Sequence, residues 1–136
     1  CGAVRVSKEN LFKQADVITI HVLLSDRTRG LVGADELALM KPSAYLVNTS
    51  RGEVVDEEAL AELLASRHIA GAGLDVYADE PNITKALLDL PNVVLLPHIG
   101  SATIEGRLEM GDKVIINIQT FWDGHAPRDR VIEAML

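Results

Sequence analysis

Two titratable side chains follow apolar stretches of the chain and could act together on a small acid. Arg51 comes soon after the apolar run 44–47, and its planar guanidinium can bind a carboxylate through two parallel hydrogen bonds. His98 follows the run 93–96, and an imidazole titrates near neutral pH, so it can give a proton to a carbonyl oxygen or take it back. These groups would suit the reduction of a 2-keto acid and the reverse oxidation.

A carboxylate beside the imidazole would hold the ring and favour its charged form. Asp79 and Glu80 both lie in the irregular stretch before the last of these runs, and their spacing does not choose between them. Considered alone, Arg51 and His98 could each have a structural role. Arginines are often surface ion-pair partners, and histidines after strands are more often structural. The chemical interpretation therefore depends on whether the fold brings the groups together.

Four short apolar runs have the length of β-strands and are mostly rich in β-branched residues or leucine: 17–22, 44–47, 69–74 and 93–96. They do not alternate with polar residues, as expected for strands that are covered on both faces. Helical patterns lie between and after them, over 7–14, 34–40, 56–66 and 103–121. This order predicts an α/β fold with a parallel sheet, in which ligands bind beyond the carboxyl ends of the strands.

Three further stretches of the chain carry structural expectations. The segment 78–90 is the longest irregular piece and is expected to form a loop of the site. Apolar residues recur at helical spacing from Met110 to Phe121, and we expect this stripe to belong to the core. Residues 131–136 are predicted to form a last short segment.

Several motifs in order resemble the signature series of the D-isomer-specific 2-hydroxyacid dehydrogenases. They are NTSRG at 48–52, VVD at 54–56, GLDVY at 73–77, EP at 80–81 and PHIGSAT at 97–103. The resemblance extends from about Ser7 to Leu136, and a linked series is far more specific than any one motif. The last motif, with Arg107 and Met110 after it, is most similar to the glyoxylate/hydroxypyruvate reductase branch.

The resemblance implies a role for each reaction residue. Arg51 would bind the substrate carboxylate beside the nicotinamide, His98 would be the acid and base, and Glu80 rather than Asp79 would be the partner of His98. The remaining residues that it implies at the cofactor, which would be NAD or NADP, are His21, Val22, Thr28, Thr49, Ser50, Asp75, Gly100 and Ser101.

Two of these cofactor residues also have structural interpretations, and one neighbour departs from the family. An aspartate such as Asp75 can simply cap the loop that follows it. His21 can be a packing or hydrogen-bonding residue. Leu23 stands where the family often has proline, which affects the expected shape of this loop but no catalytic role.

The implied fold is a Rossmann-like, doubly wound parallel sheet that is incomplete at its N-terminal side. The family's Gly-rich turn and acidic residue, which bind the pyrophosphate and the ribose, have no counterpart in the sequence. The segment Gly71–Gly73 is no substitute, because Val76 occupies the third glycine position. We therefore expect residues 1–136 to be a partial NAD(P)-binding domain without its substrate domain, a fragment that is inactive alone.

Composition limits the partners. The chain has 136 residues and a net charge of −7, with 13 basic residues scattered among 20 acidic ones, which argues against nucleic acid. No apolar run approaches the roughly 18 residues that span a bilayer. Cys1 is the single cysteine, so a Cys-rich metal site is not expected, and a reducing cytoplasm is permitted. A homodimer in the cytoplasm is the expectation.

The leading functional hypothesis is hydride transfer between NAD(P)H and a small 2-keto acid, giving a D-2-hydroxy acid, with glyoxylate or hydroxypyruvate as the substrate. D-3-phosphoglycerate dehydrogenase activity is the alternative among enzymes. The alternative from another class is a truncated domain that dimerises and catalyses nothing, since missing first strands would leave an unpaired sheet edge and uncovered apolar surface.

Overall fold

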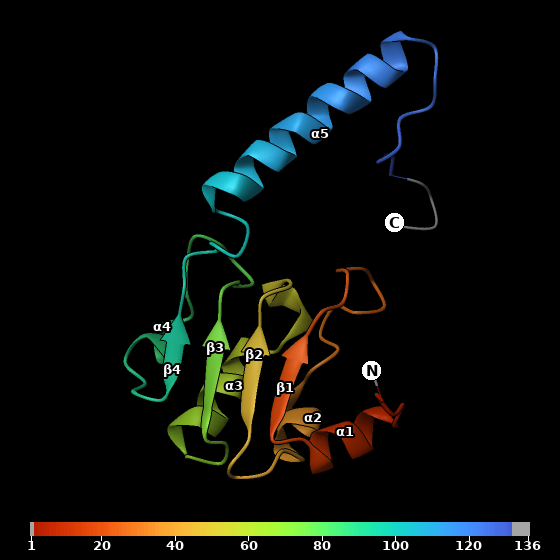
Figure 1. The fold of residues 1–136 in the computed structure, drawn as a ribbon. Helices are drawn as coiled ribbons and strands as arrows, with labels where there is room; N and C mark the ends of the chain where they lie inside the picture. The colour runs from red at the N-terminus through yellow and green to blue at the C-terminus, as the bar shows by residue number, and fades with distance from the viewer. Residues whose placement is uncertain (1, 132–136) are drawn as a thin grey trace. The chain divides into compact units, whose positions relative to one another are not determined.

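The computed structural model describes residues 2–131 and divides the chain into two compact units, with the division between His98 and Ile99. The first unit contains a β-sheet and its helices, and the second contains one long helix among its described residues (Figure 1). The predicted site residues up to His98 belong to the first unit. Gly100 and Ser101 belong to the second.

The sheet of the first unit has four parallel strands in the order β1-β2-β3-β4. The strands are β1 (Val17–Ile20), β2 (Tyr45–Asn48), β3 (Gly71–Leu74) and β4 (Val93–Leu95). Each lies within or overlaps one predicted apolar run. The α/β class and the Rossmann-like parallel sheet are therefore confirmed, and the four carboxyl ends lie along one edge.

The helices of the first unit are α1 (Lys8–Gln14), α2 (Ala34–Ala38), α3 (Glu57–Ala65) and α4 (Lys85–Leu88), with a 3₁₀-helix η1 (Gly52–Val54). Ser7 and Asp56 cap α1 and α3, because their side chains accept hydrogen bonds from main-chain N–H groups three residues on. These starts agree with the sequence. Helix α4 lies in the stretch that was predicted to be irregular, which is a correction.

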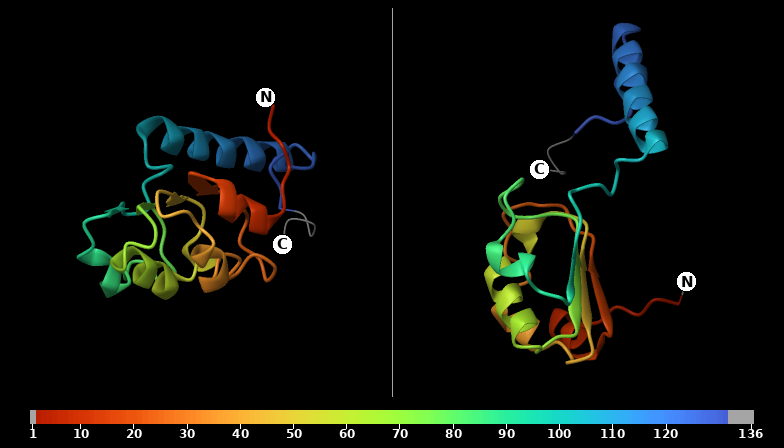
Figure 2. Two further views of the ribbon diagram at one scale, coloured as in Figure 1. Left: turned by 90° about the horizontal axis from the view of Figure 1, so that it is seen from below. Right: turned by 90° about the vertical axis from the view of Figure 1, so that its left-hand side faces the viewer.

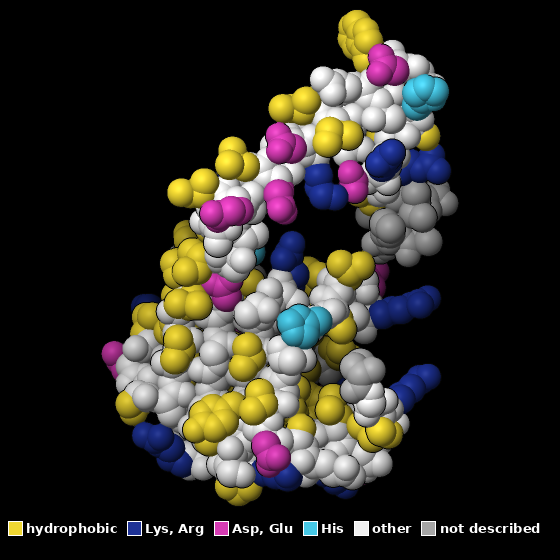
Figure 3. Space-filling view, in the orientation of Figure 1, with side chains coloured by type: hydrophobic (Ala, Val, Ile, Leu, Met, Phe, Trp, Pro, Cys, Tyr) yellow, Lys and Arg dark blue, Asp and Glu magenta, His cyan; other side chains and the backbone are white. Residues whose placement is uncertain are grey.

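The core of the first unit lies between the sheet and helices α2, α3 and α4, which cover one face (Figure 2). Its largest fully buried side chains include Leu37, Leu46, Leu60, Leu64, Ile69 and Leu87. On the other face Val17, Tyr45 and Val94 are each more than half exposed, and Figure 3 shows apolar side chains over the strands there. Strands covered on both faces were predicted, and within this unit only one face is covered.

The second unit contains α5 (Ile104–Trp122), which Thr103 caps by accepting a hydrogen bond from the Gly106 N–H. The predicted core stripe from Met110 to Phe121 is exposed, and no residue of α5 is buried. This corrects the prediction, because helical spacing identifies an apolar face and not what covers it. Asp129 folds back onto α5 by an ion pair with Lys113 at 3.0 Å.

The prediction for the C-terminal end of the chain falls almost entirely outside the described residues. The last segment was predicted over 131–136, and residues 132–136 lie outside the described residues. Among the helices of residues 2–131, none combines the length and the apolar character that crossing a membrane requires.

Candidate active site

The carboxyl ends of the strands bring most of the predicted site residues of the first unit to one edge of the sheet. His21 follows β1, Arg51 follows β2, and Asp75 follows β3 directly. His98 lies three residues beyond β4, and Glu80 reaches it from the loop after β3. The roles predicted for Gly100 and Ser101 stay predictions, since these residues belong to the second unit.

His98 and Glu80 form a hydrogen-bonded pair. The Nδ1 atom of His98 lies 2.7 Å from Oε2 of Glu80, and the two side chains are 41% and 35% exposed. Asp79 instead accepts a hydrogen bond from the side chain of Asn82 at 3.1 Å. The structure therefore pairs His98 with Glu80, the carboxylate that the resemblance favoured and that spacing left open.

Two hydrogen bonds hold the pKa of Glu80 below its usual range: one with the His98 side chain, which is the larger cause, and one from the Tyr77 N–H. The positive charge of Arg51 makes a smaller contribution in the same direction. Arg51 is thus close enough to act electrostatically on the pair. The carboxylate form of Glu80 is the one that this surrounding favours.

This lowered pKa predicts a dependence of stability on pH. A carboxyl whose pKa is lower in the folded state contributes stability above its unfolded pKa, near 4.5, and loses it as the pH falls through the folded value. We expect wild type to exceed Glu80→Gln in free energy of unfolding at neutral pH, by a margin that shrinks below about pH 4.5. Urea unfolding across pH measures this. Glu58→Gln, at an exposed glutamate of α3, is the control, and a margin that persists at the acid end contradicts the pairing.

Tyr77 connects both members of the pair to the sheet. Its N–H donates to Oε1 of Glu80 at 3.0 Å, and its buried phenol donates to the carbonyl of Leu96 at 2.9 Å. Burial raises the pKa of the Tyr77 phenol, which keeps it a donor. Two residues after Leu96, the backbone of His98 has a φ of 54°, which is an uncommon left-handed conformation. Tyr77 was not predicted to be a site residue, although it is the last residue of GLDVY.

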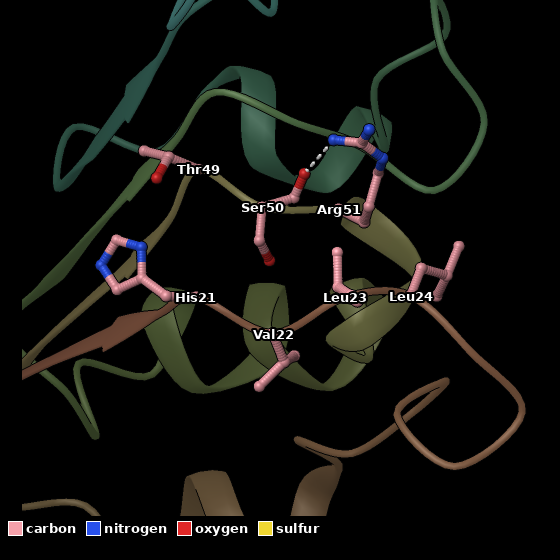
Figure 4. A pocket seen from close by; sticks show the side chains of 7 residues that line it. All are labelled: His21, Val22, Leu23, Leu24, Thr49, Ser50 and Arg51. Atoms are coloured by element: carbon pink, nitrogen blue, oxygen red, sulfur yellow. Dashed lines mark hydrogen bonds between the residues drawn. The ribbon is translucent and has the colours of Figure 1, made fainter. Parts of the chain in front are cut away.

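The turn that carries Arg51 is organised by Asn48, which is 1% exposed. The Asn48 side chain donates to the carbonyl of Arg51 at 2.9 Å and accepts from the N–H and the hydroxyl of Ser50 at 3.1 and 3.0 Å. The guanidinium of Arg51 is exposed and donates to the carbonyl of Ser50 at 2.7 Å (Figure 4). Arg51 thus presents an exposed cation from a turn that the Asn48 side chain holds.

Gly52 lets this turn contact the loop that carries Glu80. A Cβ atom at position 52 would lie 2.0 Å from the main-chain carbon of Tyr77 and 2.3 Å from the nitrogen of Ala78. Both neighbours are backbone, so they cannot rotate away. The Arg51 turn and the Glu80 loop are therefore packed directly against one another.

The substitution Gly52→Ala should lower the free energy of unfolding by about 3 kcal/mol or more, because the added methyl group forces two backbone segments apart. Gly73→Ala is the matched control, since nothing lies within 4 Å of a Cβ at that position. Urea unfolding of both variants measures the difference. Equal stability of the two variants would show that the two segments do not pack as described.

A hollow of about 410 Å³ lies between the ends of β1 and β2. Figure 4 shows the segment 21–24 facing the segment 49–51 across it. Its lining combines apolar side chains with the hydroxyls of Thr49 and Ser50. A mixed lining beyond parallel strand ends fits part of a nucleotide, so these residues could hold a dinucleotide such as NAD(P).

The side chains of two predicted cofactor residues make contacts that support structural roles, and a third residue is buried. The His21 ring bonds to the Thr19 hydroxyl at 2.8 Å while it lines the hollow. The Thr28 hydroxyl donates to the carbonyl of Leu23 at 2.6 Å, so it shapes the loop behind the hollow rather than lining it. Asp75 is buried, and its N–H donates to the carbonyl of Asn48. Their contacts with a cofactor stay predictions.

A smaller hollow of about 150 Å³ lies beside the His98–Glu80 pair and is lined by Tyr77, Glu80, Pro81, Ile83, Pro97 and His98. It gives a small ligand access to the pair. Among residues 2–131, no group of three or more His, Cys, Asp or Glu side chains is placed to hold a metal ion.

Comparison with known proteins identifies the family. Residues 1–100 match the model of the "D-isomer specific 2-hydroxyacid dehydrogenase, NAD binding domain". The chain belongs to the D-isomer-specific 2-hydroxyacid dehydrogenase family. The match ends two residues after the division between the two units, so α5 begins beyond the part that this domain model covers.

Relatives in this dehydrogenase family carry the similarity further along the chain. A glyoxylate reductase of Thermococcus litoralis is 48% identical over 135 residues, which are 99% of this chain and 41% of that protein. Glyoxylate/hydroxypyruvate reductase B of Pectobacterium carotovorum is 50% identical over 111 residues, which are 81% of this chain and 35% of that protein.

A solved structure is similar over most of the chain. An NADPH-dependent glyoxylate/hydroxypyruvate reductase from Sinorhizobium meliloti, in complex with NADP and malonate, matches with a TM-score of 0.85 and 38% identity. The match covers 93% of this chain and 42% of that one. The chain thus spans well under half the length of these dehydrogenases.

Proposed function

We propose that the protein interconverts a small 2-keto acid and the corresponding D-2-hydroxy acid, with glyoxylate or hydroxypyruvate as its substrate. The observation that carries this proposal is the 2.7 Å bond between His98 and Glu80 at the carboxyl edge of the sheet, with the charge of Arg51 acting on the same carboxylate. The names of the relatives support the choice of substrate.

Arg51 binds and orients the substrate in this proposal. The exposed guanidinium offers two parallel N–H donors, which match the two oxygens of a carboxylate. Asn48 fixes the main chain of the turn, so the orientation of the bound acid is set by a rigid part of the fold. The keto group is thereby directed toward His98.

His98 moves the proton. Its Nδ1 atom is engaged by Glu80, which leaves Nε2 to face the substrate oxygen. In reduction, protonated His98 donates from Nε2 to the carbonyl oxygen, and a hydroxyl group results. In oxidation, neutral His98 accepts that hydroxyl proton at the same atom. A bound nicotinamide supplies the hydride to the carbonyl carbon in reduction and takes it up in oxidation.

The cofactor is NAD or NADP, and Thr49, Ser50 and Val22 line the hollow that would hold part of it. We propose further that the protein acts in the cytoplasm and as a homodimer. The apolar face of the sheet that is exposed within this chain would favour the self-association. Light scattering of the full-length protein tests the dimer.

A substrate panel tests the proposed function. The full-length protein is supplied with reduced nicotinamide and, in turn, glyoxylate, hydroxypyruvate and 3-phosphohydroxypyruvate, and the loss of nicotinamide absorbance is followed. We expect kcat/KM to be highest for glyoxylate or hydroxypyruvate. A preference for the phosphorylated acid would support the phosphoglycerate alternative, and no turnover with any of the three would overturn the proposal.

A further inference from the structure

Glu57 is a buried carboxylate that the proposed mechanism does not use. It is the first residue of α3 and is 8% exposed. Its Oε1 atom accepts a hydrogen bond from the Ala78 N–H at 2.6 Å, and its Oε2 atom accepts one from the Thr84 hydroxyl at 2.6 Å. These two contacts lie at the two ends of the segment 78–84, which contains Glu80.

Hydrogen-bond donors around the Glu57 carboxylate offset the unfavourable free energy of burying its charge. A buried charge is unfavourable unless its oxygens are hydrogen-bonded, and here each oxygen has a donor. Hydrogen bonds to an ionised acceptor are about twice as strong as neutral ones. Glu57 also lies in the first turn of α3, where a negative charge is favourable. The two contacts are therefore strong restraints on the loop.

These restraints act next to the His98–Glu80 pair. The consecutive N–H groups of Tyr77 and Ala78 are held by two different carboxylates, the first by Glu80 and the second by Glu57. Gly52, which belongs to the Arg51 turn, packs against the peptide group that joins Tyr77 to Ala78. Glu57 thus contacts the backbone segment from which Glu80 reaches His98.

We propose that Glu57 is a positioning residue that holds the segment 78–84 and thereby keeps Glu80 at hydrogen-bonding distance from His98. Its effect on turnover rests on the proposed function, whereas its effect on the loop does not. Two independent measurements on the full-length protein therefore test it, one of which needs no substrate.

The first measurement is amide hydrogen exchange over residues 76–84. Glu57→Gln keeps the size of the side chain and removes its charge and one acceptor. We expect exchange at the Ala78 amide to become about 10-fold faster or more, since a charge-assisted hydrogen bond is lost or weakened. Glu58→Gln, at the exposed neighbour on α3, should leave exchange unchanged. Equal exchange in the two variants would overturn the proposed restraint.

The second measurement is steady-state kinetics with the 2-keto acid. We expect Glu57→Gln to lower kcat about 10-fold with a much smaller change in KM, because a displaced Glu80 orients His98 poorly while Arg51 still binds the acid. Glu57→Asp should restore part of kcat. In a protein that already carries Glu80→Gln, adding Glu57→Gln should lower kcat only slightly further, since Glu57 acts through Glu80. Full additivity of the two effects would contradict a positioning role.

Thr84→Val keeps the test decisive if Glu57→Gln does not fold, because it removes one donor and leaves the carboxylate in place. It should make amide exchange over residues 76–84 faster and kcat lower than in wild type, and wild-type exchange together with wild-type kcat would count against the proposal. If wild type turns over none of the 2-keto acids, the proposed function fails, and the exchange measurement still decides whether Glu57 restrains the loop.

Discussion

Replacing His98 with glutamine should lower kcat for 2-keto acid reduction by about 100-fold to 10,000-fold, the usual contribution of a general acid. Glutamine can still donate a hydrogen bond to Oε2 of Glu80, so the loop should keep its structure. It has no proton to release at neutral pH, and this is why the chemical step should slow. Steady-state kinetics on the full-length variant give kcat and KM separately.

The control for this substitution is His125→Gln, at an exposed histidine beyond α5 that has no assigned role. It should keep the kcat of wild type. If His98→Gln also kept it, His98 would be a structural residue, and proton transfer in the proposed mechanism would have to be assigned to another group. A rise in KM without a fall in kcat would mean that His98 binds substrate rather than transferring a proton.

Replacing Arg51 with alanine should lower kcat/KM by about 100-fold or more, because losing one partner of a desolvated, hydrogen-bonded charge pair costs roughly 2–5 kcal/mol. Most of the effect should be a higher KM for the 2-keto acid. Arg51→Lys should recover only part of the loss, since an ammonium keeps the charge and lacks the planar pair of donors.

The matched control for Arg51 is Arg29→Ala, which removes an exposed arginine whose ion pair with Glu53 is long, at 3.8 Å. Such a pair contributes little, so activity and stability should both stay close to wild type. An Arg51→Ala variant with the KM of wild type would show that the substrate carboxylate is bound elsewhere.

Much of the fold follows from local patterns in the sequence. Apolar runs predicted all four strands, and Ser7, Asp56 and Thr103 marked helix starts, because a side-chain acceptor at the N-cap satisfies a free N–H group. The edge position of the site also followed, since parallel strands align their carboxyl ends. These features depend on residues that are close in sequence or on a general rule of topology.

The contacts that support the site could not be predicted in this way. Glu57 lies 21 residues before Ala78, and Tyr77 lies 19 residues before Leu96, so no local pattern reveals either bond. Spacing also left Asp79 and Glu80 equivalent, and the difference between them arises because Asp79 bonds to Asn82 within its own turn. These contacts depend on which residues far apart in the sequence lie close together in the fold.

Exposure was the other feature that the sequence left open. The stripe on α5 and the second face of the sheet are apolar, as the patterns indicated, but both are exposed within their own units. A pattern of apolar residues shows which surface favours burial. It does not show whether other residues of the same unit pack over that surface.

The central claim is that Arg51 and His98 act on a 2-keto acid, and one set of assays tests it most directly. Nicotinamide absorbance is followed with glyoxylate and with hydroxypyruvate for the full-length protein and for its His98→Gln and Arg51→Ala variants. We expect turnover by wild type, near-complete loss in His98→Gln through kcat, and loss in Arg51→Ala mainly through KM. Unchanged turnover in both variants would contradict the claim and would make the residues at this edge of the sheet structural.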